Sequence, residues 1–341
     1  MPKRLVSVRT ERPWLDIVSY GRKGPNQTLR FDPGQREQIA RIVSRVPEVM
    51  VKVTGGGRSV RQVKDEIDYF GREGDLAIET DDGVALKGQG MEKFLTDDWD
   101  LELEELRSRR WVDGKPGRKA PKLVHNLMFS MPAGTPPLKV LAAARKFAQE
   151  KFALKHRYAM VLHTDQKHPH VHMLVKAMSE QGVRLNIKKA ALREWRHDFA
   201  RYLRELGVAA NATDRVVRGE TISRKSDGIY RASLRGESTH VRKRVEGVAS
   251  ELLKSNIIVE SGKDRLLEAR KEVERGWKIV ADALEQGGQH DLAAQVHGFR
   301  GTLPLPATEK ERLAHGLLSR MNRSQVSGIH RRDNAEARSR L

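Results

Sequence analysis

Two short apolar runs, separated by a polar turn, most constrain how this chain can fold. The stretch "RYAMVLHTDQKHPHVHMLVKA" (residues 157–177) has two runs of strand length joined by "TDQKHP". This pattern predicts an antiparallel hairpin within a sheet. Four of the chain's 12 histidines fall within ten residues of the same stretch. The sequence therefore gathers several imidazoles where the two strands meet.

Strand geometry brings three of these histidines within reach of one cation. Side chains alternate between the faces of a strand, so His170 and His172 project from one face, and the short turn places His163 across from them. Three imidazoles leave coordination positions open, which indicates a catalytic metal rather than a purely structural one. Asp165 is placed to hydrogen-bond the other ring nitrogen of a ligand and fix its tautomer. His168 lies in the turn, outside this ligand set.

The ligand set alone does not identify the metal. Imidazole suits Zn, Mn, Ni or Fe and favours Mg only weakly. The chain has no cysteine, so disulfides and thiolate ligands are excluded. We expect a divalent metal cofactor, Mg²⁺ or Mn²⁺, with Zn²⁺ as an alternative. The other interpretation is a histidine-rich hairpin whose rings are satisfied by backbone groups or solvent.

The chain of 341 residues is strongly basic, with a formal net charge of +19 and a pI near 10.2. This excess predicts a polyanionic partner, either nucleic acid or an anionic membrane. No apolar run reaches the length of a membrane-spanning helix and no signal peptide opens the chain. Nucleic acid is therefore the favoured partner, without membrane insertion, in a bacterial cytoplasm. Because only 5% of residues are aromatic, phosphate contacts rather than base stacking should dominate.

The order of expected elements indicates an α+β fold with a mainly antiparallel central sheet flanked by helices and a helical C-terminal region. Five expected elements precede the histidine hairpin: a strand (48–57), a helix stopped by Gly71 (58–74), a hairpin (75–88), a strand (122–132) and a helix (136–153). A further helix (189–207) follows it. Residues 1–45 are expected to be an irregular, basic N-terminal extension. Residues 46–220 should form the central domain, and residues 221–341 a basic linker and helical region.

Metal-assisted exchange of phosphodiesters requires a nucleophile, and tyrosine suits a strand that is later resealed, because phosphotyrosine is itself a phosphodiester. Tyr158 should point away from the histidine face, and Tyr20 and Tyr230 lie in expected loops. Tyr202 belongs to a helix with the core stripe Leu192, Trp195, Phe199, Leu203 and Leu206. Tyr69 falls off the apolar stripe of its helix, on the side of Asp65 and Glu66. The pattern leaves open whether Tyr69 is an exposed nucleophile or a half-buried amphipathic residue.

These motifs resemble the relaxase/mobilisation nucleases, single-strand DNA endonucleases of the His-hydrophobe-His (HUH) class that start plasmid transfer. "HTDQKHPHVHMLVKA" resembles their third motif and "HNLMFSMPAG" their second. "VMVKVTGGGRSVRQVKDEIDYFGREGDLAIETDDG" resembles the first, in which an R-[DE]-G element follows the nucleophilic tyrosine. "NIKKAALREWRHDFARYLRELGVAANATDRVVRG" is similar to the helix and Arg-Gly ending of the border-cleaving, type IV secretion branch. The resemblance covers roughly residues 48–220.

The resemblance implies a role for individual residues of a relaxase nuclease domain over residues 46–220. The implied nucleophile is Tyr69, with Asp165 as the acidic partner and candidate base; the metal ligands are His163, His170 and His172, and the DNA contacts are Ser130, Arg72 and Arg218. Two features depart from the family pattern. The tyrosine usually lies closer to the N-terminus, and His168 is an additional histidine.

The function implied by the resemblance is that of a relaxase. Such an enzyme nicks one strand at a transfer origin by tyrosine transesterification and keeps a 5′-phosphotyrosine adduct for conjugative transfer. The expected partners are single-stranded or supercoiled origin DNA, relaxosome accessory proteins and a type IV coupling protein. The C-terminal "HRRDNAEARSRL" is either a secretion signal or a solvated charged tail.

Two other functions remain open at the level of sequence. "HPHVHML" also fits the H-x-H-x-H pattern of histidine-triad nucleotide hydrolases, in which His170 would attack a nucleotide phosphate without metal. The second is a non-catalytic, basic DNA-binding relaxosome accessory protein. Insensitivity to chelators would identify the hydrolase, and a missing covalent adduct would favour the accessory protein.

Overall fold

The computed structural model describes residues 15–23, 29–112, 119–220, 229, 232–233, 235–255, 260 and 262–320. The chain divides into two compact units. The sheet unit comprises residues 45–212, and the helical unit comprises residues 1–44 and 213–341. The functional domains expected over 1–45, 46–220 and 221–341 stay a prediction.

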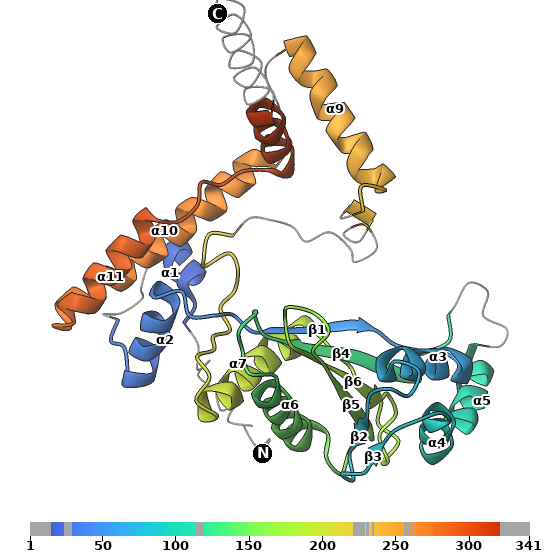
Figure 1. The fold of residues 1–341 in the computed structure, drawn as a ribbon. Coiled ribbons are helices and arrows are strands. Elements are labelled where there is room, and N and C mark those ends of the chain that lie inside the picture. Colours follow the sequence, from blue (N-terminus) through green and yellow to red (C-terminus); the bar gives the residue numbers. More distant parts are fainter. Residues whose placement is uncertain are drawn as a thin grey trace, which may run out of the picture. The chain divides into compact units, whose positions relative to one another are not determined.

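The described residues of the sheet unit form six strands, all paired antiparallel, in the order β1-β4-β6-β5-β2-β3 (Figure 1). They are β1 (Met50–Gly55), β2 (Ile78–Thr80), β3 (Ala85–Leu86), β4 (Val124–Ser130), β5 (Tyr158–His163) and β6 (His170–Lys176). β5 and β6 form the hairpin predicted around the histidines, and β2 and β3 form the other predicted hairpin. The α+β fold with an antiparallel sheet is thus confirmed.

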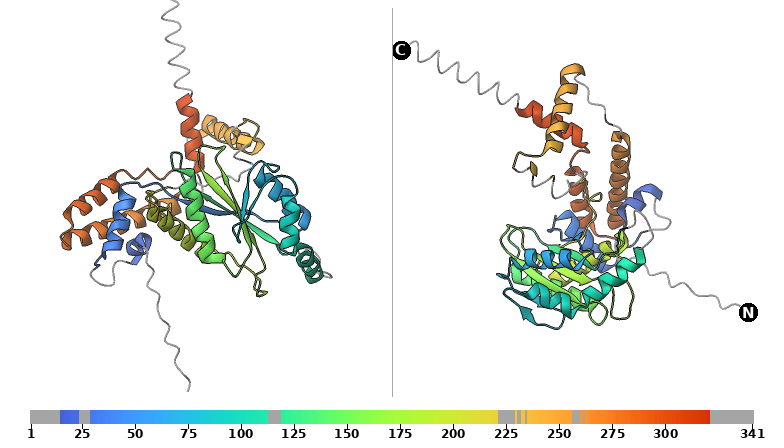
Figure 2. Two further views of the ribbon diagram at one scale, coloured as in Figure 1. Left: turned by 60° about the horizontal axis from the view of Figure 1, so that its bottom comes forward. Right: turned by 90° about the vertical axis from the view of Figure 1, so that its right-hand side faces the viewer.

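Helices cover both faces of this sheet (Figures 1 and 2). They are α3 (Val60–Gly71), α4 (Met91–Asp98), α5 (Leu101–Val112), α6 (Pro137–Phe152) and α7 (Lys189–Glu205). Because side chains alternate along a strand, β5 directs Tyr158 and Met160 into the core formed with α6 and α7. Ala159 and Val161 join the core formed with α3, α4 and α5. His163 shares the face of Ala159 and Val161, so the histidines face α3.

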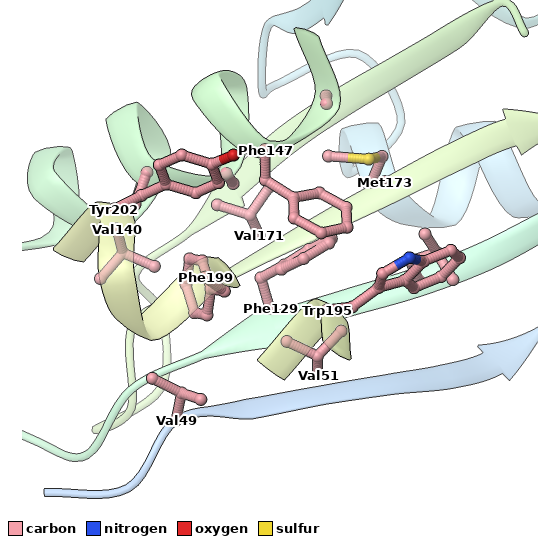
Figure 3. Packing of buried hydrophobic residues seen from close by; sticks show 14 of the residues in the cluster. Val49, Val51, Phe129, Val140, Phe147, Val171, Met173, Trp195, Phe199 and Tyr202 are labelled. Carbon is pink, nitrogen blue, oxygen red and sulfur yellow. The ribbon is translucent and has the colours of Figure 1, made fainter. Parts of the chain in front are cut away.

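Aromatic side chains hold α6 and α7 on the sheet (Figure 3). The ring centroid of Phe129 lies 4.8 Å from that of Phe147 and 5.2 Å from that of Phe199. Tyr202 is fully buried, as its place on the stripe predicts, and burial of one such ring contributes roughly 1.5–3 kcal/mol. The expectation for Leu206 is wrong: its side chain is 37% exposed, because α7 ends at Glu205 and Leu206 is the C-cap.

The helix that carries Tyr69 ends at Gly71 as expected, but for a different reason. The left-handed residues at this end are Arg72 and Glu73, with φ of 51° and 55°. At Gly71 itself, a Cβ would lie 2.0 Å from Cε of Met91, so a larger residue there would require the flexible Met91 side chain to shift. Arg72 is the left-handed C-cap of α3, three residues after the tyrosine.

The helical unit contains α1 (Ile17–Lys23), α2 (Pro33–Val43), α9 (Thr239–Ser255), α10 (Lys263–Gln286) and α11 (His290–Gly301), and residues 309–320 are also helical. None of the described helices is long and apolar enough to cross a membrane. The helices α9, α10 and α11 and the helical residues 309–320 confirm the expected helical C-terminal region over these ranges. Tyr230, the tail "HRRDNAEARSRL" and much of the basic loop expected over 215–237 lie outside the described residues.

The expectation that residues 1–45 are irregular is wrong for α1 and α2, and Tyr20 lies in α1 rather than in a loop. A capping box starts α2: the side chain of Asp32 accepts a hydrogen bond from the Gln35 backbone N–H at 2.8 Å, and the Gln35 side chain accepts from the Asp32 N–H at 3.0 Å. Pro33 occupies the first turn, where its missing N–H costs nothing.

The two ends of the chain share one hydrophobic core in the helical unit. Ile17 of α1 and Ile39 of α2 are fully buried, together with Trp277 of α10 and Val296 of α11. The indole N–H of Trp277 donates a hydrogen bond to the Val217 carbonyl at 3.0 Å. The N-terminal extension is thus part of a domain completed by the C-terminal helices.

Gly276→Ala is expected to destabilise this core, because a Cβ at residue 276 would lie 2.0 Å from the carbonyl oxygen of Ile17. The obstructing atom belongs to the backbone, so we expect a net loss of about 2 kcal/mol, although alanine favours a helix by about 1 kcal/mol over glycine. Thermal unfolding followed by circular dichroism should show a lower Tm. Gly298→Ala in α11 is the matched control, since nothing lies within 4 Å of a Cβ there. A Gly276→Ala protein as stable as the control would contradict this contact.

Candidate metal centre and nucleophile

The three predicted metal ligands lie together on one face of β5 and β6. His163 pairs in register with His170, and His172 lies opposite Val161. The ring centroid of His163 is 5.1 Å from that of His170 and 4.8 Å from that of His172, and the His170 and His172 centroids are 5.1 Å apart. One nitrogen from each ring lies within 4.8 Å of the others. The hairpin therefore brings the three imidazoles together, as the sequence predicts.

The surroundings of His170 and His172 leave ring nitrogens for a metal. Nδ1 of His170 lies 3.0 Å from the carbonyl oxygen of His168. It must donate a proton to that oxygen, so the lone pair of the neutral ring is on Nε2. Nδ1 of His172 is buried and has no hydrogen-bond partner. Such an unsatisfied buried atom calls for a partner that the polypeptide does not supply.

The imidazole of His172 is neutral at physiological pH. Burial is the largest cause that lowers the pKa of His172 to about 3, and the charges that His163, His170, Arg72 and Lys52 carry when protonated add to it. Its ring also stacks on Phe70, with centroids 4.2 Å apart. Metal ligation requires the deprotonated imidazole, so His172 fits a divalent cation in its protonation, and the three histidines fit it in their number and proximity.

Phe70 and Arg72, at the end of α3, connect the tyrosine helix to the histidines. Nε2 of His163 lies 2.7 Å from the carbonyl oxygen of Phe70. Nη2 of Arg72 lies 3.2 Å from Nδ1 of His163 and 2.6 Å from Oδ2 of Asp165. The Arg72 guanidinium carbon is 5.3 Å from the centroid of the Tyr69 ring. One arginine thus contacts the candidate nucleophile, the candidate base and a candidate ligand.

The sequence suggests a hydrogen bond between Asp165 and His163. In the structure Arg72 lies between them, and the Asp165 carboxylate forms an ion pair with Arg72 instead. Burial by itself raises the pKa of Asp165, but the hydrogen bond and charge of Arg72 outweigh this effect and hold the pKa below its ordinary value. Asp165 is therefore ionised at neutral pH, and its pairing with Arg72 makes it a weaker base.

Tyr69 is exposed, with 51% of its surface accessible. It lines a cavity of about 590 Å³ together with four carboxylate residues, namely Asp65, Asp68, Glu73 and Glu92. Burial, followed by the neighbouring Glu92, raises the pKa of Asp68. The side chain of Tyr69 also interacts with that of Arg72, and although burial lowers the pKa of Arg72, hydrogen bonds to Asp165 and Tyr69 raise it overall. The tyrosine accordingly lies between an acidic cavity and a cation.

The remaining predicted residues are placed differently. Ser130 is buried and pairs with His170 across β4 and β6, so it lies beside the histidines. His168 is exposed and contributes its carbonyl oxygen to His170. Tyr158 is buried on the opposite face. Arg218 belongs to the helical unit and pairs with Glu220 at 2.7 Å.

Sequence reasoning missed two residues of this region. Lys52 is exposed on β1, in the row of the sheet that also holds Met128 and His172. Its alternation with the inward-facing Val51 and Val53 is the signal that could have identified it. The contacts of Phe70 with two histidines had no such signal, because the residue reads as an ordinary member of a core stripe.

Comparison with known proteins agrees with this geometry. Residues 85–208 match the family model of the relaxase nuclease domain, MobA/VirD2-like. This match confirms the resemblance of this part of the chain to the MobA/VirD2-like relaxases. The matched residues include Ser130, Asp165 and the three histidines, whereas Tyr69 and Arg72 precede them.

Two curated relatives are T-DNA border endonucleases named VirD2. The protein of Agrobacterium fabrum is 24% identical over 215 residues, which cover 57% of this chain and 46% of the relative. The protein of Rhizobium rhizogenes is 25% identical over 143 residues, 38% of this chain and 30% of the relative. This chain spans less than half the length of either relative.

A solved structure described as "Molecular Basis of Vancomycin Resistance Transfer in Staphylococcus aureus" is 13% identical. The match covers 50% of this chain and 99% of that chain, with a TM-score of 0.31.

Proposed function

We propose that this protein is a DNA relaxase that nicks one strand at a transfer origin and holds the cut end on Tyr69. The observation that carries the proposal is the end of α3, where Phe70 and Arg72 tie the exposed tyrosine to a cluster of three histidines. The proposed substrate is single-stranded or supercoiled origin DNA, in a bacterial cytoplasm. Relaxosome accessory proteins and a type IV coupling protein are the proposed partners in conjugative transfer.

His163, His170 and His172 would hold the divalent metal. When bound, such an ion supplies Lewis-acid stabilisation to a non-bridging oxygen of the scissile phosphate. An all-nitrogen donor set suits Mn²⁺ better than Mg²⁺, which prefers oxygen ligands. Zn²⁺ remains an alternative on the same grounds.

In the proposed reaction, the phenol oxygen of Tyr69 forms a bond to phosphorus while the bond from phosphorus to the 3′ oxygen breaks. The DNA 5′ end then remains on Tyr69, and the 3′ oxygen leaves as a hydroxyl after it gains a proton. The positive charge of Arg72 beside the phenol stabilises the negative charge that develops when the phenol loses its proton. Asp165, which its ion pair with Arg72 holds near Tyr69, is the proposed acceptor of that proton. Resealing reverses these steps.

The protein would grip DNA mainly through phosphates. The net charge of +19 and the low aromatic content favour ionic contacts over base stacking, so binding should weaken steeply with salt. Ser130, beside His170, and Arg72, beside Asp165, are the proposed contacts near the scissile phosphate. The DNA contact predicted for Arg218 would be made from the helical unit.

A nicking assay on supercoiled DNA that carries the native origin tests this function. With Mn²⁺ we expect relaxed circles and a protein–DNA adduct that survives detergent and heat, and EDTA should abolish both. A plasmid without the origin is the control and should stay supercoiled. Cleavage of nucleotides that persists in EDTA would point to a histidine-triad hydrolase, and DNA binding without any adduct would point to an accessory protein; either result contradicts the proposal.

A further inference from the structure

The hydrogen bonds of His163 fix the positions of its protons. The guanidinium of Arg72 can only donate, so Nδ1 of His163 must accept across the 3.2 Å contact. The carbonyl oxygen of Phe70 can only accept, so Nε2 must donate across the 2.7 Å contact. The neutral ring therefore carries its proton on Nε2 and its lone pair on Nδ1, and both nitrogens are engaged by residues from the end of α3.

We propose that Arg72 competes with the divalent metal for His163, so that metal loading releases the guanidinium from this ring. The inference rests on the metal site of the proposed function, but it does not depend on DNA cleavage. It makes Arg72 a positioning residue whose placement reports whether the histidines hold a cation.

Coordination through Nδ1 would displace Arg72 directly. This nitrogen has a single lone pair, which points at Nη2 of Arg72 across the 3.2 Å contact. A guanidinium and a metal ion cannot share that lone pair, and their positive charges repel each other at such short range.

Coordination through Nε2 would displace Arg72 as well. The metal would take the lone pair of Nε2, so the hydrogen bond from Nε2 to the Phe70 carbonyl would be lost and the proton of the neutral ring would move to Nδ1. The N–H of Nδ1 would then face an N–H of Arg72, and two donors cannot bond to each other. Asp165, which already lies 2.6 Å from the same Nη2, is the nearby acceptor for the new N–H. Both modes of coordination therefore end the contact between Arg72 and His163.

After its release from His163, Arg72 would still lie beside Tyr69. Its guanidinium already interacts with the Tyr69 ring at 5.3 Å, and its left-handed backbone sits directly after α3. Once free of His163, the guanidinium is available to the phenol and to a phosphate. Metal loading and activation of the tyrosine would thereby be linked through one side chain.

Isothermal titration of Mn²⁺ into the metal-free protein, without DNA, tests the competition. Arg72→Gln should bind Mn²⁺ about tenfold more tightly than the wild type. The metal no longer has to break the charged hydrogen bond between Arg72 and His163, and the free energy of one such bond corresponds to a change in affinity of about tenfold. Lys52→Gln is the matched control: it removes the same charge near His172, and Lys52 makes no hydrogen bond to His163. We expect a gain of less than about threefold there, from charge alone.

An Arg72→Gln protein that binds Mn²⁺ no more tightly than Lys52→Gln would overturn the competition while leaving the metal site intact. Absence of Mn²⁺ binding in all three proteins would instead overturn the metal site and, with it, both proposals. A measurement on the wild type covers the case in which Arg72→Gln fails to fold. On titration with diamagnetic Zn²⁺, the side-chain ¹⁵N resonances of Arg72 and His163 should shift together, and an unchanged Arg72 resonance would contradict its release.

Discussion

Tyr69→Phe is expected to abolish the covalent protein–DNA adduct, with a fall in the nicking rate of at least about 1,000-fold. The substitution removes only the oxygen that attacks phosphorus. Because the phenol is 51% exposed and lies off the buried stripe of α3, the fold should be unaffected. Quantification of the adduct on denaturing gels with a labelled origin oligonucleotide is the measurement.

Tyr158→Phe is the matched control for this experiment. It deletes the same hydroxyl from a buried tyrosine on the opposite face of the sheet, and it should retain the adduct. If Tyr69→Phe formed as much adduct as Tyr158→Phe, another residue would be the nucleophile and the proposed role of α3 would be wrong.

His172→Gln should weaken Mn²⁺ binding by at least about 100-fold. Loss of a residue that only hydrogen-bonds a metal ligand already lowers metal affinity by about 10- to 100-fold, and His172 is a proposed ligand itself. Glutamine fills a similar volume against Phe70, which stacks on the imidazole at 4.2 Å, but it offers no imidazole nitrogen. Metal affinity measured by titration and origin nicking at fixed Mn²⁺ should fall together. Excess Mn²⁺ should restore part of the nicking.

His168→Gln is the control for the ligand set. The imidazole of His168 is exposed, and only its backbone carbonyl contacts His170, so the substitution should leave metal affinity and nicking unchanged. Equal losses in both variants would mean that the histidine-rich turn, rather than the three converging rings, binds the metal.

Much of the sheet unit could be predicted from local patterns. Alternation in β5 and β6 predicted the faces of Tyr158, His163 and His172, because successive side chains of a strand point to opposite faces of the sheet. The helical stripe likewise separated Tyr69 from Ile67 and Phe70 on α3. These predictions required only the periodicity of the backbone.

The contacts that complete the candidate site depend on the tertiary fold. Arg72 reaches Asp165 across 93 positions of the chain, and it adopts a left-handed conformation that a sequence pattern would assign to a glycine. The helices α1 and α2 were missed because their apolar faces are short and are buried by α10 and α11, far away in sequence. The capping box of Asp32 and Gln35 is a local signal for the start of α2, but the packing of α1 and α2 on α10 and α11 has no local signal.

The most direct test of the central claim is to map the DNA-linked residue by mass spectrometry. Tryptic cleavage after Lys64 and Arg72 yields the peptide "DEIDYFGR", in which Tyr69 is the single tyrosine. After nicking in Mn²⁺ and nuclease trimming, we expect a residual nucleotide mass on this peptide and on its tyrosine. A nucleotide attached to any other peptide, or to a histidine of the hairpin, would contradict the account.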